Sequence, residues 1–243
     1  MASNQVGNGL YGSIKAAVIR VAKLSASCAP ISGANNGAVS KAVVQLQAQG
    51  QYDTGTEYTQ KNGLGDILFS VKDNDKLKNL SLNLEIATRD FELIALMTGA
   101  TPIVSGAYTA GLARRGSSQS APNPVSLEIW TKVASGTGTC VTGSGQWFRT
   151  VYPKVVWTLG DSDFGANIAT YKLTGVAEGN PNWGSTGPFS DFPAGYTGVS
   201  NFNDSPEFQF IDTQYSDPTL AKGSGGVLNS AGGGYIDVVS NYT

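Results

Sequence analysis

The sequence predicts a mainly β protein, an antiparallel sandwich or barrel with one short flanking α-helix, a long inter-strand loop and extended terminal arms. In several segments every second residue is apolar, the spacing that places side chains on one face of a strand. Glycine supplies 31 of the 243 residues and, together with Asn, Asp and Pro, separates these segments as turns do. A chain of this length can bury a core without disulfide bridges.

The clearest predicted strand covers residues 80–86, where four aliphatic residues alternate with Ser81, Asn83 and Glu85. This alternation indicates one face toward a core and one polar face toward water. The same pattern predicts strands at 42–48, 67–71 and 125–129, and runs rich in Val, Ile, Tyr, Phe and Thr predict others at 17–24, 147–159, 168–177 and 207–215. Turn-forming clusters such as 35–37 and 122–124 are expected to separate the strands.

One segment, about 90–98, breaks the alternation and predicts the helix. Asp90 is an N-cap candidate, Glu92 places an acid in the first turn, and Gly99 is a stop signal. The apolar residues of the segment recur at helical spacing, so the helix should pack over one sheet. We expect Met97 to fill the core rather than to serve a function.

The composition excludes most site chemistry. Without histidine, the Ser-His-Asp and Cys-His nucleophile systems and the HExxH zinc sites are impossible. A net charge of −2 gives no basic field to hold nucleic acid by counterion release. Asp73 and Asp75 begin like a calcium loop but lack its later glycine and glutamate, and the other acids sit in turn-like sequence. We expect no catalytic residue, no metal and no cofactor.

The chain shows no targeting or membrane pattern. The start of the sequence has no basic region followed by an apolar run, so no secretory signal is expected. No apolar stretch approaches the roughly 20 residues of a membrane span, which indicates a soluble product made in the cytoplasm. Cys28 and Cys140 are too few for a thiolate metal site; free thiols are favoured and a disulfide between them stays open.

The chain divides into three predicted parts. Residues 1–16 form an N-terminal arm, 17–178 the β core, and 179–243 a Gly-, Pro- and aromatic-rich C-terminal extension, which we interpret as an arm laid over a neighbouring surface. The long loop at 49–66 has the mixed polar and aromatic composition of a protein contact, and long loops are often functional. Its candidate contact residues are Gln51, Tyr52, Asp53, Glu57, Tyr58 and Lys61.

A series of short motifs carries a family resemblance through their order. They are Ile19-Arg-Val-Ala-Lys23, Cys28-Ala-Pro30, Gly55-Thr-Glu57, Gln60-Lys-Asn-Gly63, Asp66, Lys72-Asp73, Leu77-Lys78, Leu82-Asn-Leu84 and the 90–99 segment, followed by Leu173-Thr-Gly175, Asn180-Pro-Asn-Trp-Gly184 and Gly187-Pro188. Together they resemble the major tail tube protein of long-tailed, non-contractile bacteriophages (siphoviruses), especially those of actinobacterial hosts. The likeness covers most of 17–193 and ends before the Gly/Ser-rich tail beyond about 216.

The resemblance implies a structural virion protein of the phage tail, assembled in the bacterial host cytoplasm. Six subunits would form a ring, rings would stack into a tube, and phage DNA would pass through the lumen without specific binding. The implied partners are further copies of the chain and the tail tip, tape-measure and tail terminator proteins. By position, 49–66 would be the inter-ring loop.

The polar face of strand 80–86 suggests which residues line such a tube. Asn83 and Glu85 are our hypothesis for lumen-facing positions, with the outer tube surface as the competing assignment. A weakly acidic wall would repel DNA phosphates and let the polymer slide. Two alternatives remain: a carbohydrate-binding sandwich that stacks sugars on Trp147, Trp183 and Tyr196, and the tube protein of a tail-like secretion system.

Overall fold

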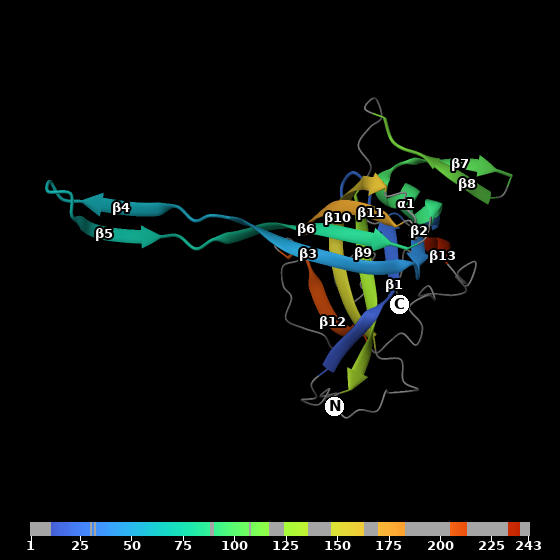
Figure 1. Cartoon of the computed structure of the whole chain (residues 1–243), viewed down its shortest axis with the longest axis horizontal. Helices are drawn as coiled ribbons and strands as arrows, with labels where there is room; N and C mark the ends of the chain where they lie inside the picture. Colours follow the sequence, from blue (N-terminus) through green and yellow to red (C-terminus); the bar gives the residue numbers. More distant parts are fainter. Residues whose placement is uncertain are drawn as a thin grey trace.

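A curved antiparallel sheet and one short helix form the body of the protein, and a two-stranded ribbon projects far from it (Figure 1). This computed structural model describes residues 11–29, 31, 33–87, 90–106, 108–116, 124–135, 147–162, 170–182, 205–212 and 233–238. The elements are β1 (Tyr11–Lys23), β2 (Gly33–Ser40), β3 (Val43–Asp53), β4 (Glu57–Lys61), β5 (Ile67–Lys72), β6 (Lys76–Ile86), α1 (Phe91–Thr98), β7 (Thr101–Ser105), β8 (Tyr108–Ala113), β9 (Val125–Ser135), β10 (Trp147–Ser162), β11 (Tyr171–Glu178), β12 (Phe208–Asp212) and β13 (Gly233–Val238).

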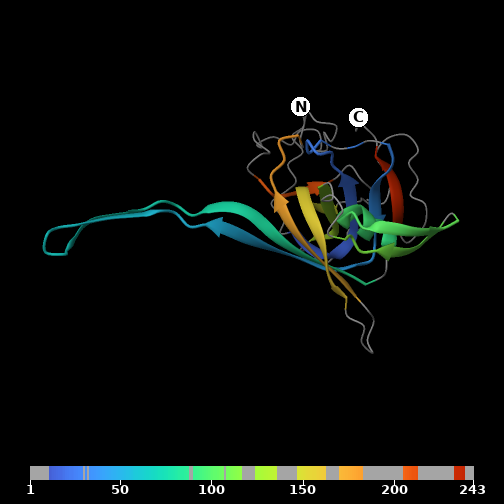
Figure 2. The same cartoon turned by 90° about the horizontal axis from the view of Figure 1, so that it is seen from above.

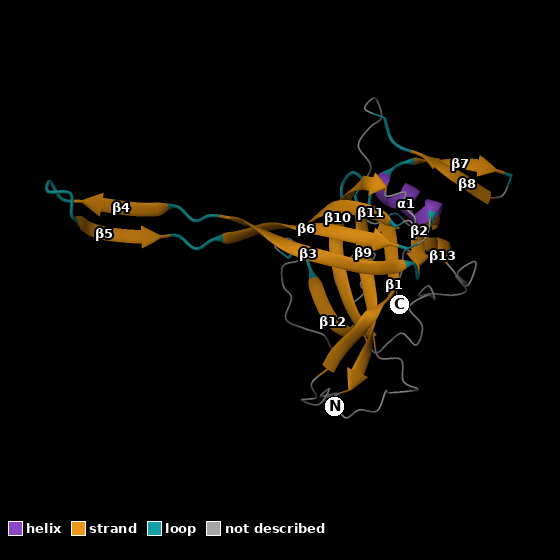
Figure 3. Cartoon of the chain, viewed as in Figure 1, coloured by secondary structure: helices purple, strands orange, loops and turns teal. Residues whose placement is uncertain are grey.

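The sheet follows the order β13-β2-β1-β9-β10-β11-β6-β3, and β12 pairs with β10 beside this path. Strands dominate the described part of the chain, as Figure 3 shows, and the strand pairs run antiparallel. Two further hairpins, β4–β5 and β7–β8, stand apart from this sheet. The predicted fold class, mainly β with one short helix, is confirmed.

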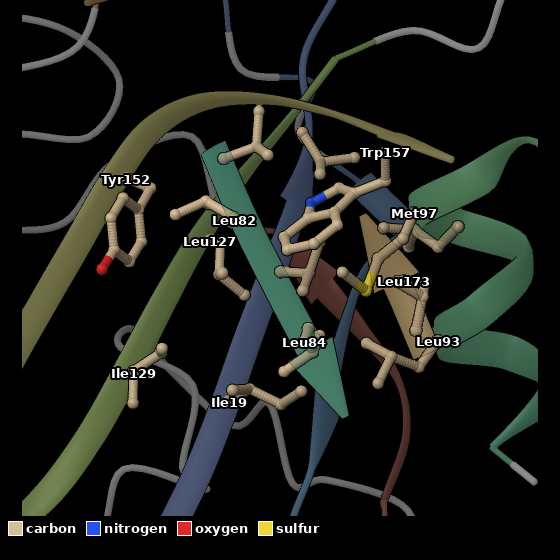
Figure 4. Packing of buried hydrophobic residues seen from close by; sticks show 14 of the residues in the cluster. Ile19, Leu82, Leu84, Leu93, Met97, Leu127, Ile129, Tyr152, Trp157 and Leu173 are labelled. Carbon is tan, nitrogen blue, oxygen red and sulfur yellow. The ribbon is translucent and has the colours of Figure 1, made fainter. Parts of the chain in front are cut away.

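The core lies inside the curve of the sheet. Leu82 and Leu84 of β6 point toward Ile19 of β1 and Leu127 of β9, and α1 closes one side with Leu93 and Met97 (Figure 4). The predicted alternation on 80–86 is confirmed, because all four of its aliphatic side chains are buried.

The helix is set by its caps as the sequence predicts. The carboxylate of Asp90 accepts a hydrogen bond from the amide of Leu93 at 3.1 Å, and Glu92 places a negative charge in the first turn. Gly99 ends the helix in the left-handed conformation, at φ 67°, where a side chain would be strained. Met97 is buried and fills the core, as expected.

Core packing between β10 and β11 depends on a glycine. Gly175 lies opposite Trp157, and a Cβ there would sit 2.7 Å from the Trp157 Cε3 atom. The indole therefore lies flat against the backbone of β11, an approach that only glycine permits.

Three sequence predictions differ from the structure. Residues 35–37 are not a turn but the middle of β2, which pairs on both sides and buries its small residues Ala38 and Ser40. Strand β1 begins at Tyr11, so 11–16 belong to the sheet rather than to an arm. Within the 179–243 extension, β12 and β13 pair with the chain's own sheet rather than with a neighbour. Residues 183–204, 213–232 and 239–243, which include Trp183 and Tyr196, lie outside the described residues, as do residues 1–10 and Cys140.

Candidate functional site

The most prominent surface feature is an arm, defined here as residues 51–78, that extends from the body well beyond the sheet (Figures 1 and 2). All of β4 and all of β5 are exposed. The six candidate contact residues predicted in the 49–66 segment lie on this arm, and they are Gln51, Tyr52, Asp53, Glu57, Tyr58 and Lys61.

The arm is a β ribbon rather than the irregular loop that the sequence predicts for 49–66. β3 and β6 continue out of the body as a pair down to Asp53 and Lys76, and β4 and β5 resume the pairing from Glu57 and Lys72 outward. Strand 67–71 is confirmed as a strand, but it lies on the arm and not over the core. A ribbon holds its side chains at fixed positions, so the arm presents a preformed surface.

Asn62 builds the tip of the arm. Its side-chain oxygen accepts hydrogen bonds from the amides of Leu64 at 2.9 Å and Asp66 at 2.8 Å. Its side-chain nitrogen donates to the Asp66 carboxylate at 3.0 Å. Gly65 adopts φ +92°, a conformation that favours glycine. These bonds close the turn locally, so the tip needs no support from the body.

The two faces of the arm differ in chemistry. Directly opposed residues share a face, which places Tyr58 with Val71 and sets Phe69 two positions along on the same side. Tyr58 is 56% exposed, Val71 44% and Phe69 57%. The other face is mainly polar: the Glu57 carboxylate accepts a hydrogen bond from Ser70 at 3.2 Å, and Leu68, 66% exposed, is its one large apolar side chain between Ser70 and the tip. The arm thus offers its apolar face to solvent.

Such a face indicates protein contact. Contiguous exposed apolar surface on a folded protein marks an interaction site, whereas single exposed residues are ordinary. Tyr52 and Leu77, paired nearer the body, are also exposed. A ribbon of this kind has no core of its own to bury these side chains, so a partner surface must cover them if they are to leave water.

A polar junction sets the base of the arm. The amide of Gly55 donates to the Asp75 carboxylate at 2.9 Å, and Lys72 lies 3.1 Å from the same carboxylate. The Gly55 hydrogen bond, and secondly Lys72, hold the pKa of Asp75 below its ordinary value. A Cβ on Gly55 would collide with the backbone carbonyl of Asp73, so the strands cross here at a distance that only glycine allows.

A second candidate surface is the outer face of the sheet formed by β3, β6, β11 and β10. Asn83 is exposed and lies between Gln47 of β3 and Thr174 of β11. Glu85, half-buried in the next row, accepts a hydrogen bond from Gln45 at 3.2 Å. Both residues therefore lie on a polar, outward face of the sheet, as the alternation over 80–86 predicts, and their lumen-facing role stays a prediction.

The charge on this face differs from the weakly acidic wall that the sequence suggests. Lys172 lies directly opposite Glu85, and Lys154 forms an ion pair with Glu178 at 2.8 Å. The hydrogen bond to Glu178 raises the pKa of Lys154. The face is consequently neutral, because each acid is matched by a lysine from a neighbouring strand, which a single strand's sequence does not reveal.

The outer edge of β3 ends the sheet, since β3 pairs only with β6 in the described part of the chain. A free edge presents unpaired amide and carbonyl groups and is a template for a strand of another chain. Register shifts at Val43/Gln45 and Gln51/Tyr52 interrupt this edge at both ends. The stretch between them remains regular and available for pairing.

Sequence reasoning missed the hairpin β7–β8, which lies at the end of the body opposite the arm (Figures 1 and 2). Ile103 and Val104 are exposed there, and no charged residue occurs from Thr101 to Ala113. Arg114 and Arg115 follow at its base and, with Trp157, line a shallow pocket of about 130 Å³. Strand β7 is only five residues long, contains Pro102 and has two adjacent apolar residues, so no alternation signals it.

A buried ionic cluster also escaped the sequence reasoning. Glu128 lies 2.9 Å from Arg149 and 3.5 Å from Arg20, and it accepts a hydrogen bond from the indole of Trp130 at 3.1 Å. Both guanidinium groups approach the Trp130 ring, at 4.8 and 5.8 Å from its centre. Because these residues come from β1, β9 and β10 and are all buried, the cluster ties the strands together rather than facing a ligand.

Other predicted candidates are not brought together. Trp147 is buried against Trp130 and Val39, so it is not available as a stacking platform for a sugar. Among the described residues, no group of three or more Cys, Asp or Glu side chains could hold a metal ion. In the same part of the chain no helix is long and apolar enough to cross a membrane, and Cys28 is a free cysteine.

No protein-family model matches the sequence, and the search of curated proteins finds no significant relative.

Proposed function

We propose that this chain is a self-assembling structural protein, the subunit of the tail tube of a long-tailed, non-contractile bacteriophage. The arm is the observation that carries the proposal. It is rigidly closed at its tip by Asn62, and it keeps Tyr58 and Phe69 exposed on one face. A stiff projection with an apolar face suits contact with a neighbouring copy, as the resemblance implies for contact between stacked rings.

The polar sheet face supports the second element of the proposal, a wall around a lumen. Among the described residues the pairing of β10 with β9 ends at Val155, so the outer part of β10 is a second free edge beside β3. Joined through these two edges, the four strands β10, β11, β6 and β3 of six copies would close into one barrel. At about 4.8 Å between strands, such a barrel is roughly 40 Å across. Amide and hydroxyl side chains with balanced charge would give DNA few counterion-releasing contacts, so the polymer could slide.

The same proposal gives the chain's partners and location. It would be a homohexameric ring component of the virion, assembled in the host cytoplasm with the tail tip, tape-measure and tail terminator proteins. No chemical step is required of it, and no cofactor.

Electron microscopy of the purified protein over a concentration series, with and without tail tips, tests the proposal. We expect hollow tubes or six-fold rings. An armless variant should form rings that do not stack; it is made by joining Asp53 to Lys76, which are paired partners, through an Asn-Gly turn. Removal of both strands matters, because deleting 51–62 alone would leave β5 unpaired.

A matched control keeps the arm and changes only its polar face, Thr59→Ala, and this variant should still form tubes. If the armless variant forms normal tubes, the arm is not part of the assembly contact. A wild-type protein that stays monomeric at every concentration and also fails to polymerise on tail tips would reject the tube function.

A further inference from the structure

Two apolar projections lie at opposite ends of the protein. The arm extends from one end of the body, and the hairpin β7–β8 extends from the other (Figures 1 and 2). On the hairpin, Ile103 is 54% exposed and Val104 64% exposed. Each projection thus exposes large apolar side chains on a paired ribbon.

The hairpin has a defined shape as well as apolar character. Ile103 lies opposite Gly111, and a Cβ on that glycine would be 3.6 Å from the Ile103 side chain. The Ile103 side chain therefore lies over Gly111 of β8, which has no side chain of its own. The result is a flat apolar surface on this face of the hairpin. A flat ribbon face such as that of Tyr58 and Phe69 can pack on a surface of this kind.

The charges of the two ends are complementary. The outer part of the arm, 57–73, carries the carboxylates of Glu57, Asp66 and Asp73 against two lysines, so its net charge is negative. The hairpin itself is uncharged, and the exposed Arg114 and Arg115 follow at its base. Opposite charges around an apolar contact favour the correct partner and register.

We infer that the β7–β8 hairpin, with Arg114 and Arg115, is the surface that receives the arm of a second copy of this chain. The inference rests on the proposed self-assembly and names its acceptor. A copy displaced along the long axis of the molecule brings its arm toward the hairpin end of its neighbour (Figure 1). Contact between two different surfaces of the same chain is heterologous, so it repeats from copy to copy and can build a stack. Contact between two arms would instead close into a dimer.

Cysteine crosslinking between two differently labelled proteins tests the acceptor. Both carry C28S and C140S; one carries Val71→Cys on the apolar face of the arm, and the other Ile103→Cys on the hairpin face that includes Gly111. We expect a short bifunctional maleimide to link them when they are mixed and assembled, and each alone to give no crosslink. Thr59→Cys, on the polar face of the arm, is the matched control and should lose the crosslink to Ile103→Cys.

The outcomes separate the acceptor from the function. Tubes without a link between Val71→Cys and Ile103→Cys would overturn the acceptor and leave the tube proposal standing. A crosslink in Val71→Cys alone would show arm-to-arm pairing and overturn it as well. A cysteine-free parent that forms neither rings nor tubes on tail tips would reject the proposed function, and the acceptor with it. As a second readout, Ile103→Ser should keep rings and lose stacking, with an unchanged circular dichroism spectrum.

Discussion

Replacing Gly175 by alanine should destabilise the body by an amount that the structure sets. The new Cβ would lie 2.7 Å from Cε3 of Trp157 and 2.9 Å from Cδ2 and Cζ3, well inside van der Waals contact. Trp157 is almost fully buried and its indole is a rigid ring, so the ring or the backbone of β11 must shift to admit the new atom. Overpacking of this kind costs about 1–3 kcal/mol, and the smaller entropy of the unfolded alanine chain offsets roughly 0.4–1 kcal/mol.

Urea unfolding followed by tryptophan fluorescence measures the difference. We expect Gly175→Ala to lose about 1–2 kcal/mol, or roughly 2–8 °C in Tm for a chain of this size. Gly111→Ala is the matched control, because its Cβ would meet only the Ile103 side chain at 3.6 and 3.7 Å, an ordinary contact. In a Trp157→Phe background the cost of Gly175→Ala should shrink, since the clashing ring atoms are removed. Equal stability of Gly175→Ala and wild type would refute the packing argument.

Three other changes test the faces of the sheet and the base of the arm. Leu84→Ala should cost about 2–5 kcal/mol in urea unfolding, whereas Asn83→Ala, next to it on the outer face, should change stability by less than about 0.5 kcal/mol; similar values would contradict the assigned faces. Gly55→Ala should keep the Tm of the body but abolish tubes in electron micrographs, because its Cβ meets the Asp73 carbonyl; normal tubes would count against a required arm geometry. The lowered pKa of Asp75 means that its hydrogen bond to the Gly55 amide is intact above the ordinary carboxyl pKa and is lost as the pH falls through the lowered value. An NMR titration of the Gly55 amide measures this midpoint, and a midpoint at or above the ordinary value would rule this out.

The body could be predicted from the sequence because a buried core imposes a period. The alternation over 80–86 exists because every second side chain of β6 must enter the core, and the helix caps at Asp90 and Gly99 act within a few residues. Strand β2 was hidden by its Asn-rich centre at 35–37. Its place depends on two flanking strands, one of them contributed from 233–238, and no local pattern contains that pairing.

The position of the arm could be predicted from the sequence, but its strands could not, because no buried core constrains them. No core lies beneath it, so nothing forces one face of 49–66 to be apolar in an unbroken alternation, and the segment reads as a loop. Its amphipathic character emerges only when Tyr58 is set opposite Val71 across the hairpin. The neutrality of the outer sheet face was invisible in the same way, since Lys172 neutralises Glu85 from another strand.

The size of the apolar patch on the arm suggests how assembly is controlled. Tyr58, Phe69 and Val71 together expose roughly 250 Å², which at about 25 cal/mol per Å² is worth roughly 6 kcal/mol when covered. Association of two free molecules costs on the order of 4–15 kcal/mol in lost translational and rotational freedom, so one arm holds a second monomer weakly at best. Several arms held in one ring share that cost, because the first contact brings the others to high effective concentration. On this reasoning single subunits stay apart despite the exposed face, and stacking begins only when a ring has formed.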